Sequence, residues 1–131
     1  MPIRDNARAG EPNGSTRNKG RTEEDLAAEY LKEKGCKILE RNFTCRFGEI
    51  DIIFEDEDGT VCFGEVKYRA LDRDGHPEEA VVYGKQKKIC RTSDHYRVKY
   101  ALDESLSYRY DVIAISPGNI RWIKNAFEYI I

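Results

Sequence analysis

Two strand-like runs of this chain carry charged residues in their interiors. The first run, residues 48–54, reads GEIDIIF and places Asp51 between isoleucines. The second run, residues 61–67, reads VCFGEVK and places Glu65 and Lys67 on either side of Val66. The two-residue period of a strand predicts that both charges share a face with Val61 and Phe63, and that residues 62, 64 and 66 lie on the other face. A charge inside an apolar strand costs free energy unless it is paired or binds something. These charges therefore need either partners or something to bind, and which of them can meet depends on how the two runs pair.

The turn between the two runs decides whether Asp51 and Glu65 can meet. With a three-residue loop over residues 57–59 and Gly59 in the left-handed conformation, Asp51 lies opposite Glu65, and their β-carbons are about 5 Å apart. A two-residue turn would shift the pairing by one residue and put the two carboxylates on opposite faces. We predict the three-residue loop.

The spacing of apolar residues predicts an α/β protein in which helices can cover both faces of a mixed sheet. The expected order of elements is αβββαββ. The helices are expected over residues 22–34 and 79–99, and the strands over residues 37–43, 46–54, 60–67, 109–115 and 120–124. The buried face of the second helix is expected to comprise Val82, Ile89, Tyr96 and Tyr100.

The ends of the first helix carry local signals. Thr22 followed by Asp25 approximates a capping box. Gly35 is expected to end the helix, because glycine readily adopts the left-handed conformation of a helix C-terminus.

Length and composition favour one soluble domain over residues 20–131, preceded by a flexible tail over residues 1–19 that is poor in apolar side chains. No apolar run approaches the roughly 18 residues of a membrane span, and the first residues lack the apolar segment of a secretory signal. The four cysteines form no Cys-x-x-Cys pair, which favours free thiols over a zinc site. We therefore expect a cytoplasmic protein that is not associated with a membrane.

Asp51 and Glu65 form a candidate cation site. Two carboxylates this close repel each other unless a cation lies between them. Mg²⁺ or Mn²⁺ suits oxygen ligands, and the carbonyl of Val66 is placed to add one. Lys67 could orient or deprotonate an attacking water, or stabilise charge on a phosphate, so the set favours phosphodiester hydrolysis. The alternative is a structural salt bridge between Lys67 and either carboxylate.

Each helix offers a further candidate for the site. Glu24 lies at the edge of the buried face of the first helix, where an acid could complete a metal shell. Glu23 points towards the same face, and acids in a first helical turn are also explained by the helix dipole. Gln86 could reach a water or a phosphate from the edge of the second helix, although an ordinary boundary residue fits equally well.

The net charge of −2 conceals a basic second helix, which carries six basic residues and one acid over residues 85–99. Local charge, and not the total, sets the attraction to phosphate over a Debye length of about 8 Å. The candidate phosphate contacts are Arg69, Lys85, Lys87, Lys88 and Arg91. The alternative is a solvated helix face, which is the usual reason for such charge.

Several of these strings, taken in their order and spacing, resemble the YraN family. They are Gly20 with residues 24–27 (EDLA), 30–31 (YL), 41–42 (RN), 48–51 (GEID), 65–69 (EVKYR), 85–86 (KQ) and 109–112 (RYDV). YraN proteins are an uncharacterised bacterial family with the PD-(D/E)XK nuclease-like fold, also called restriction-endonuclease-like, and are similar to archaeal Holliday junction resolvases. The resemblance covers about residues 20–127.

The resemblance implies roles for individual residues. Asp51, Glu65 and Lys67 would form the nuclease motif, and Glu24, rather than Glu23, would be the additional acid. Gln86 matches a position on the second helix that polar site residues occupy in related nucleases. One departure is visible: isoleucine stands at position 50, where the motif is named for proline.

The leading hypothesis is a Mg²⁺- or Mn²⁺-dependent endonuclease acting on DNA, with branched or otherwise structured DNA among the candidate substrates. Since related resolvases act as dimers, the resemblance makes a homodimer a candidate assembly, although no seam in the sequence demonstrates one. Two alternatives stay open. One is a nucleic-acid-binding module with little or no catalysis, and the other is an interaction protein whose charged triad is a structural salt bridge.

Overall fold

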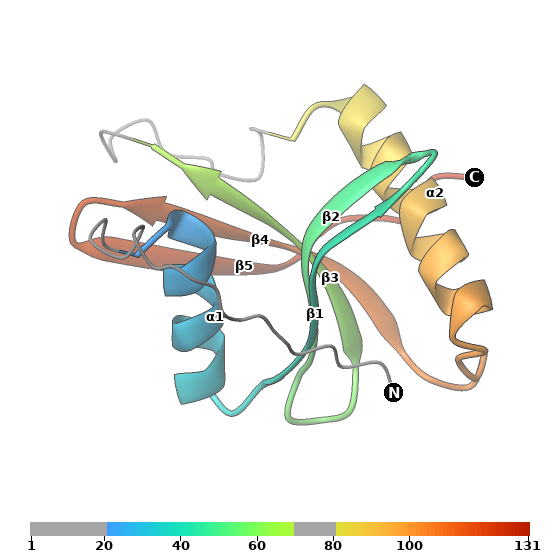
Figure 1. Ribbon diagram of the computed structural model, residues 1–131, viewed down its shortest axis with the longest axis horizontal. Coiled ribbons are helices and arrows are strands. Elements are labelled where there is room, and N and C mark those ends of the chain that lie inside the picture. Colours follow the sequence, from blue (N-terminus) through green and yellow to red (C-terminus); the bar gives the residue numbers. More distant parts are fainter. Residues whose placement is uncertain (1–20, 70–80) are drawn as a thin grey trace, which may run out of the picture.

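The computed structural model describes residues 21–69 and 81–131, which form a five-stranded sheet packed between two helices (Figure 1). The elements are α1 (Glu23–Glu33), β1 (Lys37–Cys45), β2 (Gly48–Glu55), β3 (Val61–Tyr68), α2 (Tyr83–Lys99), β4 (Tyr108–Ser116) and β5 (Asn119–Phe127). The strands lie in chain order, with β3 and β4 parallel and the other three pairs antiparallel. Because parallel strands need a long crossover, α2 connects β3 to β4. The predicted mixed sheet and order of elements are confirmed.

Several element ends differ from the prediction. β1 continues to Cys45, and β2 begins at Gly48 because residues 46–47 form the turn between them. The last strand is also longer than predicted and spans Asn119–Phe127. The predicted tail over residues 1–19 and the predicted helix start at residue 79 lie outside the described residues.

The prediction for Val82 was wrong. Val82 is 65% exposed, whereas the preceding Val81 is 2% exposed and belongs to the core. Val82 is the N-cap of α2 and has an extended backbone, so the helical spacing that aligns Ile89 with Tyr96 does not reach it. Ile89 and Tyr96 are buried as predicted, and Tyr100 packs partly buried against the same cluster.

The capping box of α1 is confirmed. The Thr22 hydroxyl accepts the N–H of Asp25, and the Asp25 carboxylate accepts the N–H of Thr22, each at 3.1 Å. Gly35 follows the C-cap with φ +94°, as expected for a residue that ends a helix in the left-handed conformation. Together these caps fix the span of α1, whose buried face consists of Ala27, Ala28 and Leu31.

Each face of the sheet has its own apolar core, one under each helix. On the α2 side, Val61 and Phe63 of β3 pack in a cluster with Ile53 of β2. On the α1 side, Cys62 of β3 packs in a cluster with Leu31 of the helix. The alternation predicted for β3 is therefore confirmed, since neighbouring side chains enter different cores.

The turn between β2 and β3 is the predicted three-residue loop. The N–H of Asp56 donates to the carbonyl of Thr60, and the N–H of Gly59 donates to the carbonyl of Asp56, each at 2.9 Å. Gly59 has φ +89°. The Asp58 carboxylate accepts the N–H of Thr60 at 3.0 Å and so supports the same loop.

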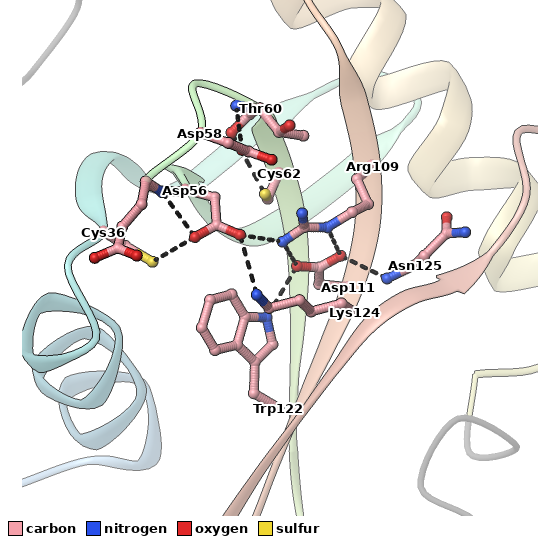
Figure 2. Close-up of polar contacts among 11 residues, drawn as sticks. Cys36, Asp56, Asp58, Thr60, Cys62, Arg109, Asp111, Trp122, Lys124 and Asn125 are labelled. Carbon is pink, nitrogen blue, oxygen red and sulfur yellow. Dashed lines mark hydrogen bonds and ion pairs between the residues drawn. The ribbon is translucent and has the colours of Figure 1, made fainter.

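A charged network ties this turn to β4 and β5 (Figure 2). Asp111 of β4 is fully buried, and its carboxylate accepts four hydrogen bonds, all of 2.9 Å: two from Arg109 and one each from the indole of Trp122 and the backbone N–H of Asn125. The same guanidinium donates to Asp56 at 2.9 Å. Every buried charge in this set therefore has an oppositely charged partner.

At the turn between β2 and β3, several members of the network contact the carboxylate of Asp56 (Figure 2). Burial raises the pKa of its carboxyl, but the hydrogen bonds from Arg109 and from the N–H of Glu57, with the nearby ammonium of Lys124, outweigh burial and leave the pKa below its usual value. The thiol of Cys36, just before β1, lies 3.8 Å from the same carboxylate. The network thus links β1, β2, β4 and β5 at one end of the sheet.

We expect Asp111→Asn to lower the free energy of unfolding by at least about 2 kcal/mol, because it removes the charge that compensates a largely buried guanidinium. Urea unfolding followed by the fluorescence of Trp122, the only tryptophan, measures this. Asp103→Asn, at an exposed position, is the matched control and should change the free energy by less than about 0.5 kcal/mol. Equal effects of the two substitutions would contradict the role of the network.

Candidate functional site

The pairing of β2 with β3 places Asp51 opposite Glu65. Ile52 pairs with Gly64, so the next positions outward are those of the two carboxylates. There the ladder gives way to a side-chain contact, because the N–H of Val66 donates to Asp51 Oδ2 at 2.8 Å. The predicted register is confirmed, and Glu65 faces α2, where its carboxylate pairs with Lys85.

Negative charge around Asp51 is incompletely compensated. Burial raises the pKa of the Asp51 carboxyl to about 7, and the charges of Glu65 and Glu24 contribute in the same direction. The hydrogen bond from Val66 and the more distant charge of Lys85 offset only part of this effect. A bound cation would stabilise a buried carboxylate with acidic neighbours more than it would stabilise an ordinary surface acid.

Glu65 is 4% exposed and is paired with a lysine that the sequence did not suggest as its partner. The ammonium of Lys85, from the first turn of α2, lies 2.6 Å from Glu65 Oε2. Lys67, two residues after Glu65, is half-buried and forms no ion pair within residues 21–69 and 81–131. In this part of the chain, the salt bridge weighed above as an alternative therefore involves Lys85 and not Lys67.

The structure distinguishes Glu24 from Glu23 in the first turn of α1, which their spacing in the sequence did not do. Glu24 is half-buried and its charge acts on Asp51, whereas Glu23 is exposed. Gln86 of α2 is half-buried, and its side-chain amide donates to the carbonyl of Val81 at 2.8 Å. That bond directs the amide nitrogen towards the start of its own helix.

Asp51 and Glu65 are the two acids of this site that could hold a metal ion. Residues 21–69 and 81–131 contain no group of three or more His, Cys, Asp or Glu side chains placed to hold one. Mg²⁺ commonly binds through one or two carboxylates and keeps several waters. Asp51 and Glu65 could hold such an ion, with the carbonyl of Val66 as a further ligand.

Further basic side chains lie on α2, which packs along β2. Lys88 and Arg91 are exposed and Lys87 is half-buried. Gly48, at the start of β2, lies against Lys88, so the helix runs alongside the strand that carries Asp51. Arg69 is exposed directly after β3, where its N–H donates to the carbonyl of Ile115 at 2.8 Å.

Sequence reasoning missed the Lys85–Glu65 pair and the network around Asp111. A signal for the network was present, because Arg109 and Asp111 are charges within the otherwise apolar strand of residues 108–116. No local signal pointed to Lys85, which is twenty residues from Glu65.

The model of the uncharacterised protein family UPF0102 matches residues 23–115. The chain belongs to this family. This confirms the resemblance to the YraN family, which is the same family. The UPF0102 protein of Lachnoclostridium phytofermentans is 47% identical over 109 residues, covering 83% of this chain and 92% of the relative. That of Persephonella marina is 46% identical over 110 residues, covering 84% and 93%.

Among solved structures, SfsA of Pyrococcus furiosus in complex with Ca²⁺ aligns with a TM-score of 0.30 and 18% identity, over 76% of this chain and 58% of SfsA. A similarity this low carries no argument about fold or function. Within the described part of the UPF0102 chain, no helix is both long and apolar enough to cross a membrane.

We expect Asp51→Asn to change how stability depends on pH when no divalent cation is present. Because the pKa of Asp51 is about 7 in the folded protein and its ordinary value is 3.8, the folded protein holds this proton more tightly than the unfolded chain. The Asp51 contribution to the free energy of unfolding should therefore fall as pH rises from about 4 to about 7. Urea unfolding in EDTA at pH 4.5, 5.5, 6.5 and 7.5 measures this.

The decline should be smaller in Asp51→Asn than in the wild type, and Asp103→Asn should keep the wild-type decline. If Asp51→Asn also keeps the full decline, the carboxyl of Asp51 does not titrate in this window.

Proposed function

We propose that this chain is a Mg²⁺- or Mn²⁺-dependent endonuclease that hydrolyses phosphodiester bonds in DNA on a PD-(D/E)XK nuclease-like fold. The observation that carries the proposal is the placement of Asp51 opposite Glu65 on adjacent strands, with uncompensated negative charge at Asp51, next to a basic helix. Two close acidic side chains beside a phosphate-attracting surface are what a cation-assisted phosphodiester hydrolase needs.

Asp51 and Glu65 would hold the cation, with the carbonyl of Val66, and Glu24 would add negative charge from α1. When bound, the cation would supply Lewis-acid stabilisation of charge on the phosphate and would lower the pKa of a water. The protein side chains then have to place the substrate and the water relative to these two acids.

Lys67 is the candidate for acting on the attacking water or on the phosphate. It follows Glu65 by two residues, so both side chains leave β3 on the α2 side of the sheet. Its side chain is half-buried and forms no ion pair with residues 21–69 or 81–131. Gln86 is a weaker candidate, since its amide nitrogen donates within the helix start.

The remaining basic residues would hold the DNA backbone. Lys87, Lys88 and Arg91 would contact phosphates along α2, and Arg69 would do so beyond the end of β3. The same proposal has three further parts. The substrate would be branched or otherwise structured DNA, the protein would act as a homodimer, and it would be located in the cytoplasm.

A nucleic-acid-binding module with little catalysis is the second candidate function. The Lys85–Glu65 pair favours it, because an ammonium at 2.6 Å already compensates one of the two carboxylates. This candidate predicts binding that weakens with salt and is unaffected by Lys67→Ala.

Cleavage of DNA tests the proposal. Linear, nicked, flapped and four-way DNA would be incubated with the protein in Mg²⁺, Mn²⁺ or EDTA. We expect cleavage with either metal and none in EDTA, and we expect Asp51→Asn and Lys67→Ala each to reduce the rate at least about 100-fold. Asp103→Asn removes one negative charge, as Asp51→Asn does, but at an exposed position. It should cleave like the wild type.

Cleavage in EDTA, or cleavage that survives both substitutions, would contradict the proposed mechanism. Salt-sensitive binding without cleavage of any substrate form would favour the binding module instead.

A further inference from the structure

Lys85 lies in an unusual place for a lysine. It belongs to the first turn of α2, which contains no acidic residue, and the dipole of a helix disfavours positive charge at its N-terminus. Its ammonium nevertheless lies 2.6 Å from Glu65 Oε2 on the neighbouring strand. The unfavourable interaction of Lys85 with the helix dipole is therefore offset by its ion pair with Glu65 in the candidate cation site, and not by an acidic residue in the first turn of α2.

The two partners differ in how much they depend on the pair. Glu65 is 4% exposed, so its negative charge needs a compensating charge close by. Lys85 is 45% exposed, so its ammonium can leave the carboxylate and be hydrated. Asp51 has a different kind of partner, since it accepts the N–H of Val66. The pair can therefore separate without leaving the lysine buried and unpaired, provided that another cation reaches Glu65.

We propose that Lys85 is the counter-ion of Glu65 in the cation-free protein and competes with the divalent cation for that carboxylate. This rests on the proposed function, because it takes Asp51 and Glu65 as the residues that hold the cation. An ammonium that hydrogen-bonds Oε2 and a cation that binds Glu65 compete for the same negative charge, so loading the site requires Lys85 to move towards solvent. Lys85 thus lowers the affinity of the free protein for the divalent cation.

Direct measurement of Mn²⁺ binding without nucleic acid tests this. Calorimetry, or the electron paramagnetic resonance of unbound Mn²⁺, would give the dissociation constant at pH 7.5 for the wild type and for Lys85→Met, Lys85→Gln and Lys85→Arg. The two neutral variants should bind Mn²⁺ about tenfold more tightly than the wild type, because they lack the competing charge. Lys85→Arg keeps the charge and should bind within about twofold of the wild type.

Lys32→Met is the matched control, since it removes one positive charge from an exposed position in the last turn of α1. It should leave the dissociation constant within about twofold of the wild-type value. Urea unfolding of each variant shows that the chain is folded, and the two neutral replacements at position 85 give independent readings if one of them does not fold.

Equal or weaker Mn²⁺ binding by Lys85→Met and Lys85→Gln would overturn the competition, as would tighter binding by Lys85→Arg. Asp51→Asn separates this failure from that of the proposed function. If Asp51→Asn weakens Mn²⁺ binding and the neutral variants at position 85 do not tighten it, the competition alone fails. If no variant binds Mn²⁺, or Asp51→Asn leaves binding intact, the cation site itself is wrong and both proposals fail.

Discussion

The pairing register of β2 and β3 is the constraint on which the candidate site depends. A three-residue loop with Gly59 in the left-handed conformation sets that register, and a shift by one residue would move Asp51 to the opposite face of the sheet. Because each face has its own core under its own helix, such a shift would also move the apolar side chains of β2 into the wrong core. Burial and turn geometry thus act together to bring Asp51 opposite Glu65.

Two aspartates of this sheet have similar surroundings in the sequence but differ in how far the folded protein compensates their charge. Asp51 and Asp111 each lie within an apolar strand. Asp111 accepts four hydrogen bonds, two of them from the guanidinium of Arg109, so its charge is compensated in the folded protein. Asp51 accepts one from Val66 and lies near two further acids. The uncompensated charge, rather than the charge alone, makes Asp51 the candidate for function.

Much of the fold could be predicted because its signals are local. The capping box at Thr22 and the alternation along β3 depend on residues a few positions apart, and both are confirmed. Val82 was misplaced because helical periodicity does not show where a helix begins, and the N-cap has an extended backbone. The partner of Glu65 could not be predicted, since Lys85 approaches it only through the docking of α2.

The sequence by itself determined the order of the elements, the two faces of β3, the turn that aligns β2 with β3, and membership of the UPF0102 family. These features follow from side-chain periodicity, turn chemistry and similarity along the chain. Only the tertiary structure decided which charges are compensated: Glu65 by Lys85, Asp111 by Arg109, and Asp51 incompletely. The reason is that compensation depends on distances of a few ångströms between distant segments, and packing alone sets those distances.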